Sequence, residues 1–224
     1  MTVLVRLLLL AVAAPLAAQS VRGRLEGRVP AASIPVIDSL VRTAAQENLP
    51  TEPLVQKAIE GGAKHVSGDR IVKAVELNLE QLRDARALLL RAGDAAPITP
   101  SEVASVVSAR KRGLDAPVVE RIVAALPSEP RGSALHAVAD LVAHHFDSDT
   151  ATDLILEAVR QGMRGGRLLD VSNAAIQEVQ RGRTRAEAVD LIRREIPNVP
   201  PPPPPTKAAV LRARRPVGGT APSP

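Results

Sequence analysis

The chain has 224 residues and a formal net charge of +5, with 20 prolines, no cysteine, no tryptophan, no tyrosine and a single phenylalanine, Phe146. The absence of cysteine excludes disulfides, thiol nucleophiles, iron–sulfur clusters and cysteine-ligated zinc. The near-absence of aromatic side chains excludes stacking platforms for single-stranded nucleic acid and most aromatic binding floors, so the core is expected to be aliphatic.

The first 18 residues have the layout of a secretory signal peptide. Arg6 supplies one positive charge, an unbroken apolar run extends from Leu7 to Ala18, and polar residues begin at Gln19. The run is shorter than the roughly 20 apolar residues that a membrane span needs. We therefore expect residues 1–18 to be a signal peptide and the mature protein to be exported, periplasmic or extracellular and associated with the cell envelope. Retention of the run as an uncleaved anchor is the alternative; after cleavage no transmembrane span is expected.

Two basic segments flank the predicted folded region. Residues 19–32 are arginine-rich without clear apolar periodicity, which predicts a flexible arm. Residues 197–224 contain six consecutive prolines and no acidic residue, which predicts a disordered tail with an extended polyproline spacer. The predicted folded body, residues 33–196, is nearly neutral, so contact with a polyanion is expected at the termini. The candidate contacts in the tail are Lys207, Arg212, Arg214 and Arg215.

Every strong periodicity between residues 33 and 196 is helical. Apolar residues recur at three-and-four spacing in about nine segments, and no convincing strand alternation is present. Two capping boxes, Thr99–Glu102 and Thr184–Glu187, mark helix starts. The sequence therefore predicts an all-α domain, either a multi-helix bundle or a short α-solenoid.

Three predicted helix endings have the residue pattern of a Schellman motif. Asn48–Leu49, Gly113–Leu114 and Gly162–Met163 each pair a residue that tolerates positive φ with a large apolar one. If each ends the first helix of a unit, the domain consists of three degenerate three-helix units. These would cover residues 33–93, 99–147 and 148–196. The uneven spacing leaves ordinary helix–turn punctuation as an equal alternative.

His136, Asp140 and His144 are the candidate catalytic residues, with His136 and His144 as candidate metal ligands. Their spacing of four places them on one side of a helix, where they could bind a metal or pair a base with a carboxylate. The apolar residues of the same helix lie nearly opposite, so a solvated polar face is the favoured interpretation.

Glycine pairs and arginines offer weaker signals. Gly61–Gly62 and Gly165–Gly166 match no phosphate-binding loop and are predicted to be helix ends. Arginines concentrate between Arg160 and Arg194, and we interpret them mainly as solvated surface charge, with an anionic partner as the alternative.

These patterns favour an exported, non-enzymatic helical scaffold or interaction protein of the cell envelope, with a protein partner and no cofactor. One alternative is an envelope hydrolase or metal-dependent enzyme centred on His136, Asp140 and His144. Another is a polyanion-binding protein that contacts an anionic polymer or lipid surface through its basic termini. Nucleic acid is not the expected partner of an exported chain.

Overall fold

The computed structural model describes residues 20–92, 98–126 and 131–198. Within these ranges the chain forms ten α-helices and two short 3-10 segments and no strand, which confirms the predicted all-α class. The predicted signal peptide and the tail from residue 199 onward lie outside the described residues. So do the four candidate polyanion contacts, Lys207, Arg212, Arg214 and Arg215.

The elements follow one another with short connections. In chain order they are α1 (Val21–Leu25), η1 (Ala31–Ser33), α2 (Ile34–Gln46), α3 (Glu52–Ala63), α4 (Gly68–Arg91), α5 (Pro100–Lys111), α6 (Ala116–Ala125), α7 (Arg131–Ala143), α8 (Ser148–Arg160), α9 (Gly166–Gln180), α10 (Arg185–Glu195) and η2 (Ile196–Asn198). Both predicted capping boxes form, at the starts of α5 and α10.

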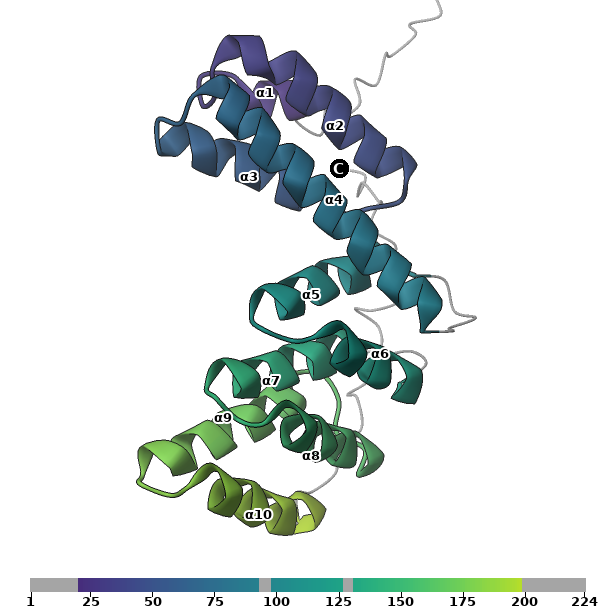
Figure 1. Cartoon of the computed structure of the whole chain (residues 1–224), viewed down its shortest axis with the longest axis vertical. Coiled ribbons are helices and arrows are strands. Elements are labelled where there is room, and N and C mark those ends of the chain that lie inside the picture. Colours follow the sequence, from purple (N-terminus) through teal and green to yellow (C-terminus); the bar gives the residue numbers. More distant parts are fainter. Residues whose placement is uncertain (1–19, 93–97, 127–130, 199–224) are drawn as a thin grey trace, which may run out of the picture.

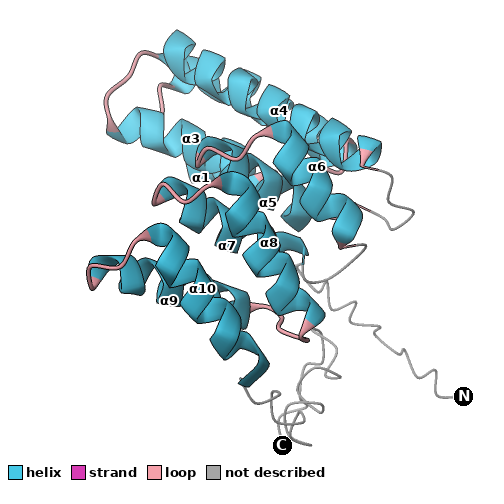
Figure 2. Ribbon diagram, turned by 60° about the horizontal axis from the view of Figure 1, so that its bottom comes forward, coloured by secondary structure: helices cyan, strands magenta, loops and turns pink. Residues whose placement is uncertain are grey.

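The helices stack in two layers as a short α-solenoid, one of the two predicted architectures (Figure 1). The even-numbered helices from α2 to α10 each pack on the next one in their layer. In the other layer α1 packs on α3, α5 on α7, and α7 on α9. Figure 2 shows α4, α6, α8 and α10 following one another down the molecule. Each helix buries its apolar stripe against neighbours in both layers, so the core runs along the stack.

One connector recurs in four helical hairpins, α3–α4, α5–α6, α7–α8 and α9–α10. A residue with positive φ ends the first helix, and the N-cap of the second helix follows two positions later. The positive-φ residues are His65, Gly113, His145 and Gly182, and the corresponding N-caps are Ser67, Asp115, Asp147 and Thr184. The residue between them donates its N–H to the carbonyl five positions earlier, as in Phe146 to Leu141 at 3.1 Å. This is the Schellman ending.

The repeating element is thus a two-helix hairpin, which favours the alternative of ordinary helix–turn punctuation over three-helix units. The boundary between residues 147 and 148 falls inside the α7–α8 hairpin. The predicted Schellman endings at Asn48, Gly113 and Gly162 do form, with φ of 55°, 101° and 87°. However, they end α2, α5 and α8, which belong to different layers. The Schellman ending occurs in connections within a hairpin and in connections between successive hairpins, so it does not mark the period of the repeat.

The predicted flexible arm is wrong for residues 20–32. Ser20 caps α1 by accepting from the Gly23 N–H at 3.2 Å, and Leu25 is fully buried. Arg24 donates two hydrogen bonds of 2.7 Å to Glu52 of α3. The four-residue spacing of Val21, Leu25 and Val29 was the overlooked signal, since it places three apolar side chains on one side of the segment.

The core is aliphatic, as predicted. Its members are alanine, valine, leucine and isoleucine, together with Phe146 and Met163. Two charged residues are buried as well, Glu178 and Arg131. Arg131, 2% exposed, is the largest fully buried side chain of the described residues.

Candidate functional site

The structure places His136 and Asp140 on α7, which packs against α5, α8 and α9, and His144 in the turn directly after α7. His136 and Asp140 are half-buried, and His144 is exposed. Asp140 forms an ion pair with Arg112 at the end of α5. The prediction that this polar side of α7 is solvated is therefore wrong for His136 and Asp140. Helix α5 covers part of that side, which lies opposite the apolar residues of α7.

The surroundings of these residues disfavour metal binding. Burial, and then the positive charge of Arg112, lower the pKa of His136. His144 places Nδ1 2.8 Å from the backbone carbonyl oxygen of Asp140 rather than from its carboxylate. No three histidine, aspartate or glutamate side chains converge as metal ligands within the described ranges. The partner of Asp140 is the cation Arg112, whereas a metal site or an acid–base pair would require a further carboxylate or a histidine beside it. This arrangement therefore gives no support to the enzyme alternative.

The arginines concentrated in the last third of the chain are largely engaged within the fold. Arg181 and Arg183 both pair with Glu178, and together they lower its pKa, Arg183 contributing most. Elsewhere, arginine side chains donate to carbonyls left open at helix ends, which the helix dipole makes electronegative. These bonds are Arg86 to Glu47 at 2.8 Å, Arg110 to Leu114 at 2.7 Å, Arg131 to Leu126 at 2.8 Å, Arg164 to Val159 at 2.8 Å and Arg185 to His144 at 3.0 Å.

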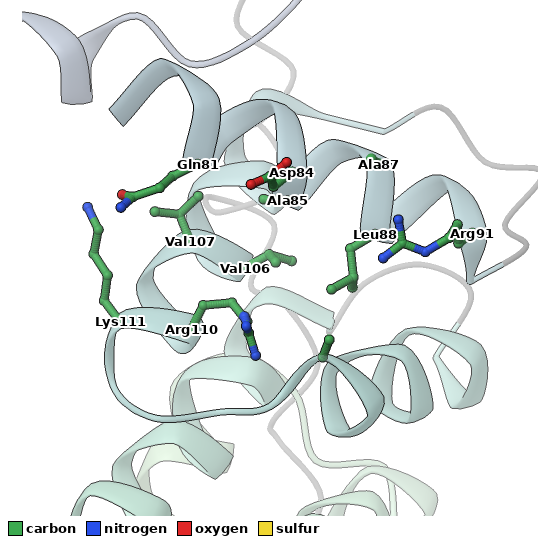
Figure 3. Close-up of a pocket in the computed structure, with 11 residues that line it drawn as sticks. Gln81, Asp84, Ala85, Ala87, Leu88, Arg91, Val106, Val107, Arg110 and Lys111 are labelled. Atoms are coloured by element: carbon green, nitrogen blue, oxygen red, sulfur yellow. The ribbon is translucent and has the colours of Figure 1, made fainter. Parts of the chain in front are cut away.

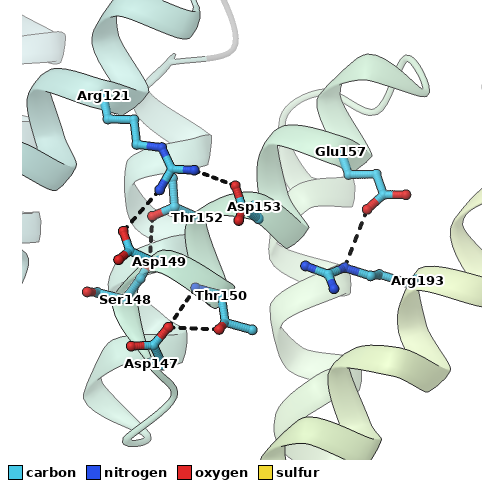
Figure 4. A network of polar contacts seen from close by, with 9 residues as sticks. All are labelled: Arg121, Asp147, Ser148, Asp149, Thr150, Thr152, Asp153, Glu157 and Arg193. Atoms are coloured by element: carbon cyan, nitrogen blue, oxygen red, sulfur yellow. Dashed lines mark hydrogen bonds and ion pairs between the residues drawn. The ribbon is translucent and has the colours of Figure 1, made fainter.

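Arginine–carboxylate pairs also bridge each consecutive pair of helices in the even-numbered layer. They form a ladder of exposed or partly exposed ion pairs along the solenoid, part of which is drawn in Figure 4. Its rungs are Arg83–Glu47 at 2.8 Å, Arg91–Glu120 at 3.4 Å, Arg121–Asp149 at 3.0 Å and Arg193–Glu157 at 3.4 Å. Arg121 also pairs with Asp153 at 2.5 Å. Because the rungs are exposed or partly exposed, each adds little stability.

A groove of about 530 Å³ lies between α4, α5 and the start of α6 (Figure 3). Its apolar part consists of Ala85, Ala87, Leu88, Val106, Val107 and Ala116, and its polar part of Gln81, Asp84, Arg91, Arg110 and Lys111. The residues that line the groove belong to α4, α5 and the start of α6, and none belongs to α3. Helix α5 packs on α4, but α3 and α5 do not form a packed pair as α5 and α7 do.

Sequence reasoning did not identify this groove. The main apolar stripe of α4 contains the buried residues Leu79, Leu82 and Leu89, whereas Leu77 and Leu88 lie off it. Apolar residues outside a helix's main stripe were the available signal, because they mark a second apolar contact.

No protein-family model matches the chain, and neither a curated protein nor a solved structure is significantly similar to it. None of the described helices combines the length and apolarity required to span a membrane. Function must therefore be argued from the geometry of the described residues.

Proposed function

We propose that this chain is an exported, non-enzymatic helical scaffold that binds a protein partner in the cell envelope. The observation that carries the proposal is the open groove between α4 and α5, which has an apolar floor and a charged rim. Stacked helical hairpins suit this task, because solenoids present extended surfaces that are rigid without requiring a large globular core. Groove recognition by helical partners is a common use of such surfaces.

Export is tested with the first 32 residues fused to a phosphatase reporter that is active only outside the cytoplasm. We expect activity from this fusion and a strong decrease when charged residues interrupt the apolar run from Leu7 to Ala18. A fusion that stays inactive and cytoplasmic would overturn the export part of the proposal.

The scaffold part is tested in cells by photo-crosslinking from several exposed positions along the solenoid. We expect one envelope protein to be crosslinked reproducibly from neighbouring positions of one surface. A purified protein with metal-dependent hydrolytic activity and no crosslinked partner from any position would favour the enzyme alternative instead.

The polyanion alternative depends on tail residues outside the described ranges and is tested separately. It requires retention on heparin or anionic liposomes that falls with salt and disappears when residues 207–215 are deleted. Retention that survives this deletion would remove the tail from consideration.

A further inference from the structure

One side of α4 carries a stripe of side chains that is exposed except at the buried Leu88 and that leads into the groove. At 100° per residue, seven side chains fall within about 40° of one line along the helix. They are Arg70, Lys73, Leu77, Gln81, Asp84, Leu88 and Arg91. A helix of this length extends about 36 Å, so the stripe is long enough to lie along a partner helix of several turns.

The stripe has two apolar positions that fit the role of anchors. Leu77 is 50% exposed although it is a large aliphatic side chain, whereas Leu88 is 5% exposed and, like Val107 of α5, lines the groove. A single exposed leucine is ordinary on a protein surface. Here, however, Leu77 lies on the same face as Leu88, three turns along the helix, which is the spacing that an amphipathic helix presents to a partner.

Basic side chains dominate the rim of the groove. Asp84 is the one acidic lining residue among those described, against Arg91, Arg110 and Lys111. Lys111 is exposed, and no hydrogen bond or ion pair is seen for it within the described residues. The other two cations already have partners: Arg91 pairs with Glu120 at 3.4 Å, and Arg110 donates to the Leu114 carbonyl at 2.7 Å and lies 3.9 Å from Asp115. Such exposed pairs are weak, so an incoming carboxylate can compete for these cations.

We propose that the α4–α5 groove binds an acidic amphipathic helix of a protein partner. The apolar face of that helix packs on Leu77, Leu88 and Val107, and its carboxylates face Arg91, Arg110 and Lys111. This inference rests on the proposed scaffold function and specifies the chemistry of its partner.

The charge of the groove also disfavours the chain's own C-terminal tail as the occupant. The tail is basic, with Lys207, Arg212, Arg214 and Arg215 and no acidic residue. Like charges at the rim would repel it.

The test uses the purified protein without its signal segment and two fluorescent helical peptides of equal length. Both peptides carry the same leucine stripe, and the remaining positions are glutamate in one and lysine in the other. The variants Leu77→Glu and Lys111→Glu alter the stripe and the rim. Leu90→Glu and Arg160→Glu are matched controls, since Leu90 is exposed on the same helix but outside the groove, and Arg160 is exposed on α8. Circular dichroism verifies that all variants are folded.

We expect the glutamate peptide to bind and the lysine peptide to bind at least about tenfold more weakly, as charge complementarity requires. Leu77→Glu and Lys111→Glu should each weaken binding of the glutamate peptide by about tenfold, whereas both control variants retain it. Absence of binding by the glutamate peptide, equal binding of both peptides, or equal losses in the control variants would overturn the inference. A partner crosslinked in cells from another surface would also overturn it, while leaving the scaffold function in place.

Discussion

The buried Arg131 and the partly exposed Glu102 form an ion pair that joins three helices. Arg131 begins α7, and its Nη1 donates to Oε1 of Glu102 at 3.0 Å. The other carboxylate oxygen of Glu102 accepts from the Thr99 N–H at 2.9 Å and so completes the capping box of α5. Arg131 Nε donates to the Leu126 carbonyl at the end of α6 at 2.8 Å. One arginine thereby links the starts of two stacked helices to the end of the helix between them in sequence.

Arg131→Ala should lower the free energy of unfolding by about 1–3 kcal/mol, because it leaves the partly buried Glu102 carboxylate and the Leu126 carbonyl without their donor. Urea unfolding followed by circular dichroism measures this loss. The matched control is Arg121→Ala, which removes an exposed rung of the ladder and should cost no more than about 1 kcal/mol. Equal small losses of unfolding free energy in both variants would show that the Arg131–Glu102 pair stabilises the fold no more than an exposed pair does.

Gly62→Ala should displace the N-terminal segment from α3. A Cβ at Gly62 would lie 1.8 Å from the backbone oxygen of Arg28, so the segment that includes Leu25 must move. We expect a loss of about 1–3 kcal/mol, typical of overpacking, and faster tryptic cleavage after Arg28.

Gly166→Ala is the control for this prediction. Gly166 lies at the start of α9, and an added Cβ there would meet nothing within 4 Å. The free energy of unfolding of the Gly166→Ala variant should stay the same or rise by a few tenths of a kcal/mol, since alanine restricts the unfolded chain and favours the helix. Unchanged proteolysis of Gly62→Ala would contradict the close packing of Arg28 on α3.

Acidification from neutral pH should destabilise the protein partly through His136. Burial and Arg112 lower the pKa of His136 in the folded state, so the unfolded state binds a proton first as the pH falls below about 6.5. The stabilising contribution is fully present above that pH and is lost progressively toward the lower, folded-state pKa. Chemical unfolding at a series of pH values from 7.5 to 5 measures the slope, and His136→Gln should reduce it. An unaltered slope in His136→Gln would assign the effect to other groups.

The ion-pair ladder should respond to salt more strongly than the Arg131–Glu102 pair does. In a double-mutant cycle of Arg121 with Asp153, we expect a coupling energy of about 0.2–1 kcal/mol at low salt and a smaller value at high salt. The cost of Arg131→Ala should change less over the same range, since solvent ions screen a partly buried pair much less. A salt-independent coupling of Arg121 with Asp153 would mean that the rung is shielded from solvent.

Local patterns were sufficient for the all-α class, the aliphatic core, both capping boxes and the three predicted Schellman endings. Each depends on residues within one or two turns of each other, as in Thr184–Glu187 or Gly162–Met163. The hairpin period escaped detection because His65 and His145 adopt positive φ without being glycine. Such residues reach that conformation only when the surrounding structure favours it.

The candidate site depended on contacts between residues far apart in the chain. The side of α7 that carries His136 looked solvated when the helix was considered alone, and it is half-covered because α5 stacks beside it and presents Arg112 to Asp140. The burial of Arg131 and the groove beside Leu88 also result from packing between helices that are separate in the sequence. Helical periodicity identifies the face that a helix buries against its neighbours, but the identity of those neighbours follows from packing of the whole stack.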